Sequence, residues 1–532
     1  MSVKVILKGI EMKKKILSIT AICLTLVILT VVGLGFVITP VMKAPKNEIP
    51  DGVKPFSSED GVMSNYYRIP SVITTEDGTL VASIDARFGG THDSANNLDT
   101  AVSISTDNGK TWSKSTLALY FDDWDNSKTI LKQNGKLTTK DSASFIDPSM
   151  VQDKNTGRIF MFVDAYPYAT GATNSVKGSG FTEIDGQKYL MLCKDGEKDF
   201  NYTVRENGAI YDKNGEKTEY SLNDKYEILQ NGKPLTVKQK KQRFWYNISF
   251  GTKTDKEIAM NIMYKDALFK PMKTSYIYMT YSDDNGKTWA NPVNLNAQIK
   301  PNDEAFMGVC PGRAIQIQNG KYAGRLLFTA YYLDNETGVQ KFTCVFSDDN
   351  GVTWNVGQSV ELTEEVPNIS ETQIIELPNG NLQSYSRTTA GYVATATSTD
   401  GGNVWSDLQL VKELPLTTGS GCQVSAINYN GKIDGSDAVI LSAPAGESRT
   451  NGFVYIGLIK ENADSTSGYE IEWTYKKEIT DKNTNFAYSC LTQMQNGEIG
   501  LLYEQANQPQ TVDTVVFKSY TTDELCETKN EK

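Results

Sequence analysis

Four copies of one eight-residue pattern recur along this 532-residue chain and limit the folds open to it. Each copy reads Ser-x-Asp-x-Gly-x-x-Trp and follows alternating apolar and polar residues that predict a β-strand. The copies are Ser105–Trp112, Ser282–Trp289, Ser347–Trp354 and Ser398–Trp405. Their Asp-Asn-Gly or Asp-Gly-Gly centres predict tight turns, because Asn and Gly tolerate positive φ. A pattern that recurs once per small sheet is typical of repeat architectures, since one sheet cannot bury its own apolar face.

The spacing of the repeats predicts a β-propeller with one insertion. The last three copies begin 65 and 51 residues apart, about the length of one four-stranded blade each. The first two begin 177 residues apart, and the stretch from Tyr166 to Ser275 between them is dense in hairpin signals. From Tyr66 onward the chain reads as short strands and turns without long helical periodicity. We therefore expect an all-β fold with a small inserted β-domain.

These patterns divide the chain into five expected segments. They are 1–45, a hydrophobic segment; 46–165, the first part of the propeller; 166–275, the inserted β-domain; 276–522, the second part of the propeller; and 523–532, a polar and unstructured tail.

The N-terminal segment predicts a location outside the cell. Lys13, Lys14 and Lys15 precede 27 uncharged, mostly apolar residues, from Ile16 to Met42. A helix of that length spans a bilayer, and its positive flank stays cytoplasmic. A cleaved signal peptide is the alternative, although its apolar region is usually shorter. Either way we expect an extracellular protein, anchored at the cell surface or secreted, which contacts membrane only through this segment.

Composition excludes several classes of function. The net charge of −11, from 53 basic and 64 acidic residues, argues against a nucleic-acid partner. His92 is the single histidine, which argues against a multi-histidine metal site and, unless His92 serves it, against Ser-His-Asp chemistry. The seven cysteines are isolated and read as small buried hydrophobes. We expect no cofactor and no catalytic metal, and a calcium ion would be structural at most.

Arginine is scarce in this chain, with nine among the 53 basic residues. Because lysine supplies most of the positive surface, each arginine is a candidate for a task that lysine does poorly. That task is the bidentate recognition of a planar anion.

Four further motifs carry a family resemblance. Tyr67–Pro70 contains Arg-Ile-Pro where the propeller begins, and Glu371 and Arg387 lie sixteen residues apart. Arg449 stands in PAGESRTNG, and Tyr488 begins YSCLTQMQNGEIGLLYE. In these motifs and their order, from about residue 60 to 520, the chain resembles the bacterial sialidases (neuraminidases), whose Asp box is the repeat above. Asp boxes also occur on non-catalytic propellers, so any activity depends on the other motifs. The resemblance implies a six-bladed propeller.

The resemblance also implies how the substrate is bound. Sialic acid carries a carboxylate on its anomeric carbon, and three guanidiniums would clamp it, those of Arg68, Arg387 and Arg449. Glu504 would hold Arg68 in place. Arg87 and Asp147 stand where the family holds the hydroxyl and N-acetyl substituents of the sugar.

Asp147 could equally cap the turn before Pro148. Arg313 is a candidate for the rim of the pocket, with a structural role as the alternative.

The implied chemistry is retaining hydrolysis with a tyrosine nucleophile, which is an exception among glycosidases. An anionic nucleophile would be repelled by the substrate carboxylate, whereas a neutral phenol is not. Because an unperturbed tyrosine has a pKa of about 10, Tyr488 needs a base, and the family gives that role to Glu371. Asp93, in a glycine-containing loop 25 residues after Arg68, is the expected general acid, and Asp99 is the alternative. His92 is incidental or tunes Asp93.

We therefore expect a monomeric exo-sialidase that acts on sialylated glycoproteins, glycolipids and oligosaccharides. An intramolecular or intermolecular trans-sialidase on the same fold is the first alternative. Intramolecular enzymes are helped by an aromatic wall, often a tryptophan shortly after the Tyr-Glu segment, and here that stretch has none. A wall could come instead from Trp124, Phe244 or Trp245. A non-catalytic lectin that binds sialic acid is the remote alternative, and linkage preference stays open.

Overall fold

The computed structural model describes residues 52–59, 61–64, 66–126, 139–245, 248–505 and 515–530. The expected N-terminal hydrophobic helix lies outside these residues. Within the described part of the chain, no helix has the length and apolar character needed to cross a membrane. Nearly all regular structure there is β, with two short α-helices, α2 (Asn296–Ile299) and α3 (Thr522–Leu525).

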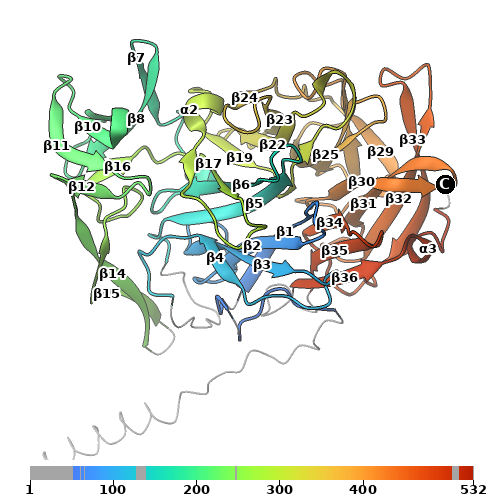
Figure 1. The fold of residues 1–532 in the computed structure, drawn as a ribbon, viewed down its shortest axis with the longest axis horizontal. Helices are drawn as coiled ribbons and strands as arrows, with labels where there is room; N and C mark the ends of the chain where they lie inside the picture. The colour runs from blue at the N-terminus through green and yellow to red at the C-terminus, as the bar shows by residue number, and fades with distance from the viewer. Residues whose placement is uncertain are drawn as a thin grey trace, which may run out of the picture. The chain divides into compact units, whose positions relative to one another are not determined.

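The strands form largely antiparallel sheets that follow one another along the chain (Figure 1). The largest has nine strands, β1 (Tyr66–Thr74), β2 (Leu80–Arg87), β3 (Leu98–Ser105), β4 (Thr116–Leu119), β5 (Ser144–Gln152), β6 (Ile159–Tyr166), β17 (Tyr276–Ser282), β18 (Val293–Asn294) and β20 (Gly312–Arg313). The next contains β19 (Phe306–Val309), β21 (Ile315–Gln316), β22 (Leu326–Leu333), β23 (Gln340–Ser347) and β24 (Asn355–Val356).

Three more sheets complete the series. The first contains β25 (Ile369–Glu376), β26 (Leu382–Thr388), β27 (Tyr392–Thr395), β28 (Thr397–Ser398) and β29 (Gln409–Pro415). The second contains β30 (Ser425–Ile433), β31 (Ser436–Pro444), β32 (Gly452–Glu461) and β33 (Tyr469–Glu478). The third contains β34 (Ser489–Gln493), β35 (Ile499–Glu504) and β36 (Val515–Tyr520).

Strands of successive sets lie against one another around a common centre. Strand β1 contacts β5 on one side and β34, from the far end of the chain, on the other. Strand β25 contacts β22 and β30, and β30 contacts β34. Apolar side chains fill the space between sheets, as where Phe162 stacks on Phe328 with ring centroids 4.0 Å apart. The expected all-β, propeller-like arrangement is confirmed. The number of blades stays a prediction, because pairing of Leu98 with Ser144 joins the first two sets of strands in one sheet.

The stretch between β6 and β17 adds strands outside this ring. Eight form one sheet: β7 (Phe181–Ile184), β8 (Gln187–Lys194), β9 (Tyr202–Val204), β10 (Ala209–Tyr211), β11 (Lys217–Leu222), β12 (Ile228–Gln230), β13 (Lys233–Pro234) and β16 (Phe269–Pro271). Strands β14 (Thr236–Trp245) and β15 (Ile248–Ala259) pair as a separate hairpin. Buried residues of the eight-stranded sheet, such as Ile210 and Phe269, share one apolar cluster with Tyr276 and Tyr278 of β17.

The Asp boxes form the tight turns that the sequence predicts. In the second box Ser282 Oγ accepts a hydrogen bond from the Gly286 amide at 2.8 Å. Asp284 accepts from the Thr288 amide at 2.9 Å and from its hydroxyl at 2.6 Å. Asn285 and Gly286 have φ of 59° and 83°, the left-handed region in which these residue types are favoured. Each box therefore closes the turn that leads to the outer strand of its sheet.

The C-terminal tail differs from expectation, because residues 521–530 are ordered. Helix α3 begins with a capping box, in which the Thr521 hydroxyl accepts from the Glu524 amide while the Glu524 carboxylate accepts from the Thr521 amide. Leu525 is buried, and the Asn530 amide donates to the Thr474 carbonyl of β33. The polar composition of the tail predicts no structure, but the capping box and the buried Leu525 give it a fixed conformation.

Candidate active site

A cavity of about 920 Å³ opens where the innermost strands β1, β5 and β25 begin. Seven of the nine predicted site residues line it. They are Arg68, Asp93, Asp147, Glu371, Arg387, Arg449 and Tyr488. The sequence therefore brings to one place residues that lie up to 420 positions apart, as Arg68 and Tyr488 do.

Tyr488 and Glu371 form a buried pair at the floor of this cavity. The Tyr488 hydroxyl donates to Glu371 Oε1 at 2.5 Å, and the two residues are 7% and 4% exposed. Glu371 lies where the register between β25 and β26 shifts, between Ile369 and Thr372, an irregularity that re-aims side chains. Burial, together with the negative charge of Glu371, raises the pKa of Tyr488 well above its usual value. The phenol is thus neutral, with a carboxylate in place to take its proton.

Three guanidiniums surround the Tyr488 ring. Arg387 Nη1 donates to the Tyr488 hydroxyl at 3.0 Å and to Glu371 Oε2 at 2.6 Å. The Cζ atoms of Arg68 and Arg449 lie 5.4 Å and 5.3 Å from the ring centroid. Arg449 stands at a left-handed position, φ 56°, and its Nε donates to the Gly421 carbonyl. The clustered cations form a site for an anion directly beside the phenol.

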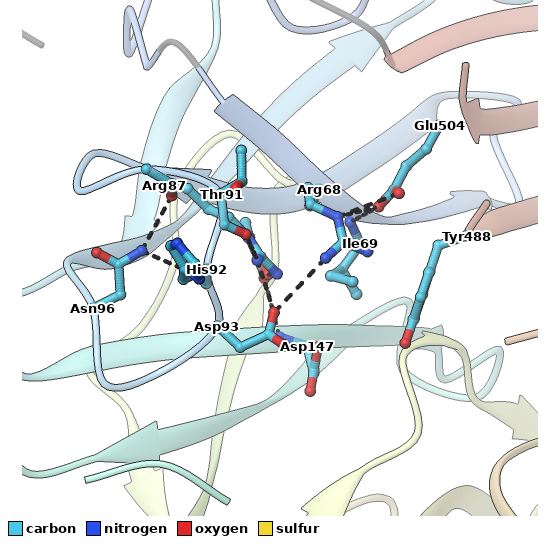
Figure 2. Close-up of polar contacts among 12 residues, drawn as sticks. Arg68, Ile69, Arg87, Thr91, His92, Asp93, Asn96, Asp147, Tyr488 and Glu504 are labelled. Atoms are coloured by element: carbon cyan, nitrogen blue, oxygen red, sulfur yellow. Dashed lines mark hydrogen bonds and ion pairs between the residues drawn. The ribbon is translucent and has the colours of Figure 1, made fainter. Parts of the chain in front are cut away.

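Glu504, on β35, holds one of these cations and the backbone next to it (Figure 2). Its Oε2 accepts from Arg68 Nε at 3.3 Å, and its Oε1 accepts from the Ile69 amide at 2.8 Å. Ile69 has φ 62°, which is strained for a β-branched residue and marks a conformation that the surroundings impose. Glu504 therefore supports Arg68 from behind, as the sequence predicts, and stabilises the turn that aims it.

Asp93 stands at the mouth of the cavity between two arginines, as Figure 2 shows. Its Oδ1 accepts from Arg87 Nη1 at 2.7 Å and lies 3.8 Å from Arg68 Nη1. Burial acts to raise its pKa, but the charges of Arg87 and Arg68 prevail and hold the pKa of Asp93 below its usual value. The carboxylate is therefore ionised at neutral pH.

Arg87 lies behind Asp93, and its guanidinium contacts the side chains of Asp93 and Asp85. Its side chain is fully buried, and its Nη2 donates to Asp85 at 2.8 Å. Arg87 is not among the residues that line the cavity, but it donates a hydrogen bond to Asp93, which does line it. Direct contact of Arg87 with a sugar stays a prediction, whereas its contact with Asp93 is a feature of the structure.

The other acidic candidates separate clearly. Asp147 lines the cavity, with φ 63°, and its amide donates to Asp85 Oδ1 at 3.0 Å. Burial and the neighbouring carboxylates of Asp85 and Asp164 raise the pKa of Asp147 well above its usual value. Asp99 is buried outside the cavity and accepts from the Phe121 amide. The alternative assignment of the acid to Asp99 is therefore wrong, because its carboxylate holds a loop.

The cavity contains residues that no sequence motif predicts, and some predicted residues lie outside it. Tyr166 and Tyr331 line the cavity, although nothing but their strand patterns marks them in the sequence. Arg313 lies outside this cavity, which corrects its assignment to the rim. Trp124 is buried outside it and packs on Gly251, so it provides no aromatic wall.

His92 does line the cavity, and its side chain is exposed. The side chains of Phe244 and Trp245 lie outside the described part of the structure. Within the residues described, no cluster of three or more His, Cys, Asp or Glu is arranged to hold a metal ion.

Comparison with known proteins matches this geometry to a family. The model of the BNR repeat-like domain matches residues 224–503, and that of the BNR/Asp-box repeat matches residues 103–114. The intramolecular trans-sialidase from Ruminococcus gnavus, solved with oseltamivir carboxylate, is 38% identical with a TM-score of 0.82, over 91% of this chain and 99% of that one. This chain belongs to the sialidase family.

Two further sialidase relatives are similar over most of this chain. The anhydrosialidase of Macrobdella decora is 39% identical over 88% of the chain, and Sialidase B of Streptococcus pneumoniae is 39% identical over 85%. The matched regions cover 62% and 63% of those relatives, so this sialidase chain spans less than two thirds of their length.

Proposed function

We propose that this protein is a retaining exo-sialidase that removes terminal α-linked sialic acids from glycoproteins, glycolipids and oligosaccharides. One observation carries the proposal: a buried Tyr488–Glu371 pair stands among three guanidiniums that converge from separate sheets. A carboxylate on the reacting carbon would bind those cations and bring that carbon next to the phenol. Few other substrates combine an anion and an electrophilic carbon in this way.

The proposed first step breaks the glycosidic bond and forms a sialyl-tyrosine. The Tyr488 oxygen attacks the anomeric carbon while its proton moves to Glu371, 2.5 Å away. The bond to the departing oxygen breaks, and Asp93 protonates that oxygen. In the second step water attacks the same carbon, Asp93 takes its proton, and Tyr488 leaves and recovers its proton from Glu371. Two displacements give net retention.

Asp93 has to gain a proton before it acts as an acid. The charges of Arg87 and Arg68 favour its ionised form. A substrate carboxylate bound to Arg68 would offset part of this positive charge and raise the pKa of Asp93. We therefore propose that substrate binding itself prepares the acid, and that Arg87 positions it.

The decisive test is the variant Tyr488→Phe, assayed with a fluorogenic sialoside. It should lose nearly all turnover and still bind sialic acid, because the arginines remain. Tyr332→Phe is the matched control, since Tyr332 is buried in β22 and lies outside the cavity. Substantial turnover by Tyr488→Phe would overturn the proposal. Wild-type protein that binds sialic acid without turnover would support the remote alternative, a lectin.

An intramolecular trans-sialidase is the second candidate, because similar proteins bear that description. The Ruminococcus gnavus relative is named an intramolecular trans-sialidase and the Macrobdella decora relative an anhydrosialidase. In such a reaction a hydroxyl of the bound sugar, in place of water, attacks the intermediate. Proton NMR of the released sugar separates free sialic acid from an anhydro product, and added lactose tests for intermolecular transfer.

We further propose six blades, an extracellular location and a monomer. The nine-stranded sheet contains two sets of four antiparallel strands, β1–β4 and β5, β6, β17 and β18, which with the four remaining ring sheets make six. The apolar segment from Ile16 to Met42 supports export. Cell fractionation tests the location, and light scattering tests the monomer.

A further inference from the structure

A second cavity, of about 680 Å³, lies at the opposite end of the same inner strands. Strand β1 contributes Arg68 to the catalytic cavity and Thr74 to this distal cavity, and β25 contributes Glu371 and Glu376 in the same way. Five or six residues of extended strand separate the members of each pair, about 17–20 Å. The two cavities share no lining residue, so the distal cavity is a separate feature.

Arg313 lines the distal cavity and is held by its backbone. It belongs to β20, pairs with Met150 of β5, and donates its amide to Gln373 Oε1 at 3.1 Å. Within the described ranges its guanidinium makes one long hydrogen bond, from Nη1 to the Leu491 carbonyl at 3.4 Å. Among the described residues, its buried Nε has no hydrogen-bond partner. Because the Nε atom is closed to solvent, a ligand in the cavity would meet the guanidinium at its Nη atoms, of which Nη2 donates no hydrogen bond among the described residues.

The acidic groups of this cavity are engaged elsewhere. The Glu376 carboxylate accepts from the amides of residues 318 and 319 at 2.7 Å and 2.6 Å. Glu76 pairs with Lys154, and Asp437 pairs with Lys432. No ion pair of Arg313 with a carboxylate occurs among the described residues, and burial lowers its pKa. Arg313 is thus a cation in a water-accessible cavity without a counter-charge from the described chain.

Arg449 provides an internal comparison. Four arginines line the two cavities, and within the described ranges Arg449 and Arg313 are the two that have no carboxylate partner. Arg449 faces the place where the proposed function puts a ligand carboxylate. By the same electrostatic reasoning, the counter-charge of Arg313 comes from a ligand.

We propose that the distal cavity binds a small tetrahedral oxyanion, sulfate or phosphate, at Arg313. A guanidinium presents parallel N–H donors that match two oxygens of such an anion. The hydroxyl pair of Thr74 and Thr492, 2.8 Å apart, lines the same cavity and offers further polar contacts. The site is independent of the proposed function, because it uses none of the catalytic residues.

Thermal unfolding of the full chain tests the site. Sulfate should raise the unfolding temperature above that in sodium chloride of equal ionic strength, by about 2 °C or more. Because the catalytic arginines also attract sulfate, the comparison is made in the Arg449→Met background. Sulfate also stabilises proteins in general, because it is excluded from their surface, so the test is the difference between two variants. Arg449→Met should show a larger sulfate response than Arg449→Met with Arg313→Met. An equal response in the two variants would overturn the proposal.

A direct measurement guards against a variant that fails to fold. Wild-type crystals soaked in selenate should show an anomalous peak within hydrogen-bond distance of the Arg313 guanidinium, and phosphate should displace it. A peak at the catalytic arginines with none at Arg313 would overturn the proposal. The catalytic peak serves as the internal control for soaking.

Discussion

A single carboxylate, that of Glu504, fixes both the direction of Arg68 and the strained backbone of Ile69. We predict that Glu504→Gln raises KM for a sialoside about 10-fold or more, since hydrogen bonds to charged groups contribute about 1.5–3 kcal/mol. Turnover at saturation should fall less, because Tyr488 and Glu371 remain. Steady-state kinetics measures this split. Glu498→Gln, at a half-buried position just after a turn, is the control, and an unchanged KM in Glu504→Gln would contradict the role.

The position of Asp93 predicts a dependence on the leaving group. Asp93→Ala should lose about 100-fold or more of its turnover on sialyllactose, whose leaving oxygen needs a proton. It should lose far less on an aryl sialoside, whose leaving group departs without one. Comparing kcat/KM on the two substrates measures the difference. Equal losses on both would show that Asp93 acts in another way.

Much of the site could be predicted residue by residue. The contacts of Arg87 are an exception. Residues that belong to distinctive motifs, such as Arg68 and Tyr488, line the cavity as expected. Whether an arginine meets the ligand or a neighbour depends on packing, which its motif does not encode. Asp85 and Arg87 lie two apart on one strand and so share a face, and that signal could have revealed their ion pair.

At the scale of elements, the fourth Asp box lacks a side-chain hydrogen bond that the first three make. In the first three, a threonine hydroxyl donates to the box aspartate at 2.6 Å. The fourth has Val404 at that position, where the amide alone donates to Asp400. We predict that Val404→Thr raises the free energy of unfolding by about 0.5–1.5 kcal/mol.

Denaturant unfolding measures that gain. The control is Val352→Thr, which makes the same chemical change in the third Asp box at a side chain that is 75% exposed. In that box the aspartate already accepts a hydrogen bond from the Thr353 hydroxyl. A gain of equal size in both variants would mean that polarity, and not the missing bond, stabilises the turn.

The elements also show why sequence predicts some features and misses others. Repeated turns and alternating strands depend on neighbouring residues, so they could be predicted from local patterns. The parallel pairing of Leu98 with Ser144 links strands across a long connection, and no local pattern encodes it. The ordered tail was within reach, because Thr521 and Glu524 form a capping box that the sequence displays.

For the whole molecule, buried carboxylates predict how stability changes with pH. Burial raises the pKa of Asp85 and of Asp123 to about 7 in the folded protein. Their unfolded pKa is about 4, so between pH 4 and 7 the folded state binds more protons than the unfolded state. The stabilisation is complete below pH 4 and is lost as pH rises through 7. We therefore expect the unfolding temperature to fall steadily from pH 5 to pH 7.

The fall in unfolding temperature between pH 5 and 7 can be assigned to carboxyl groups, because His92 is the single histidine of the chain. Lys300, whose pKa burial lowers to about 7, opposes the trend only above that pH, which sets the upper limit of the window. The variant Asp123→Asn has a side chain of similar shape at the contacts with Ser142 and Ala143. It has no carboxyl group that titrates. Its unfolding temperature should fall less between pH 5 and 7, by an amount that reflects about 1.4 kcal/mol per unit of pKa shift. An identical slope in wild type and variant would mean that Asp123 stays ionised in the folded protein, and that the trend comes from the growing negative charge of the whole molecule.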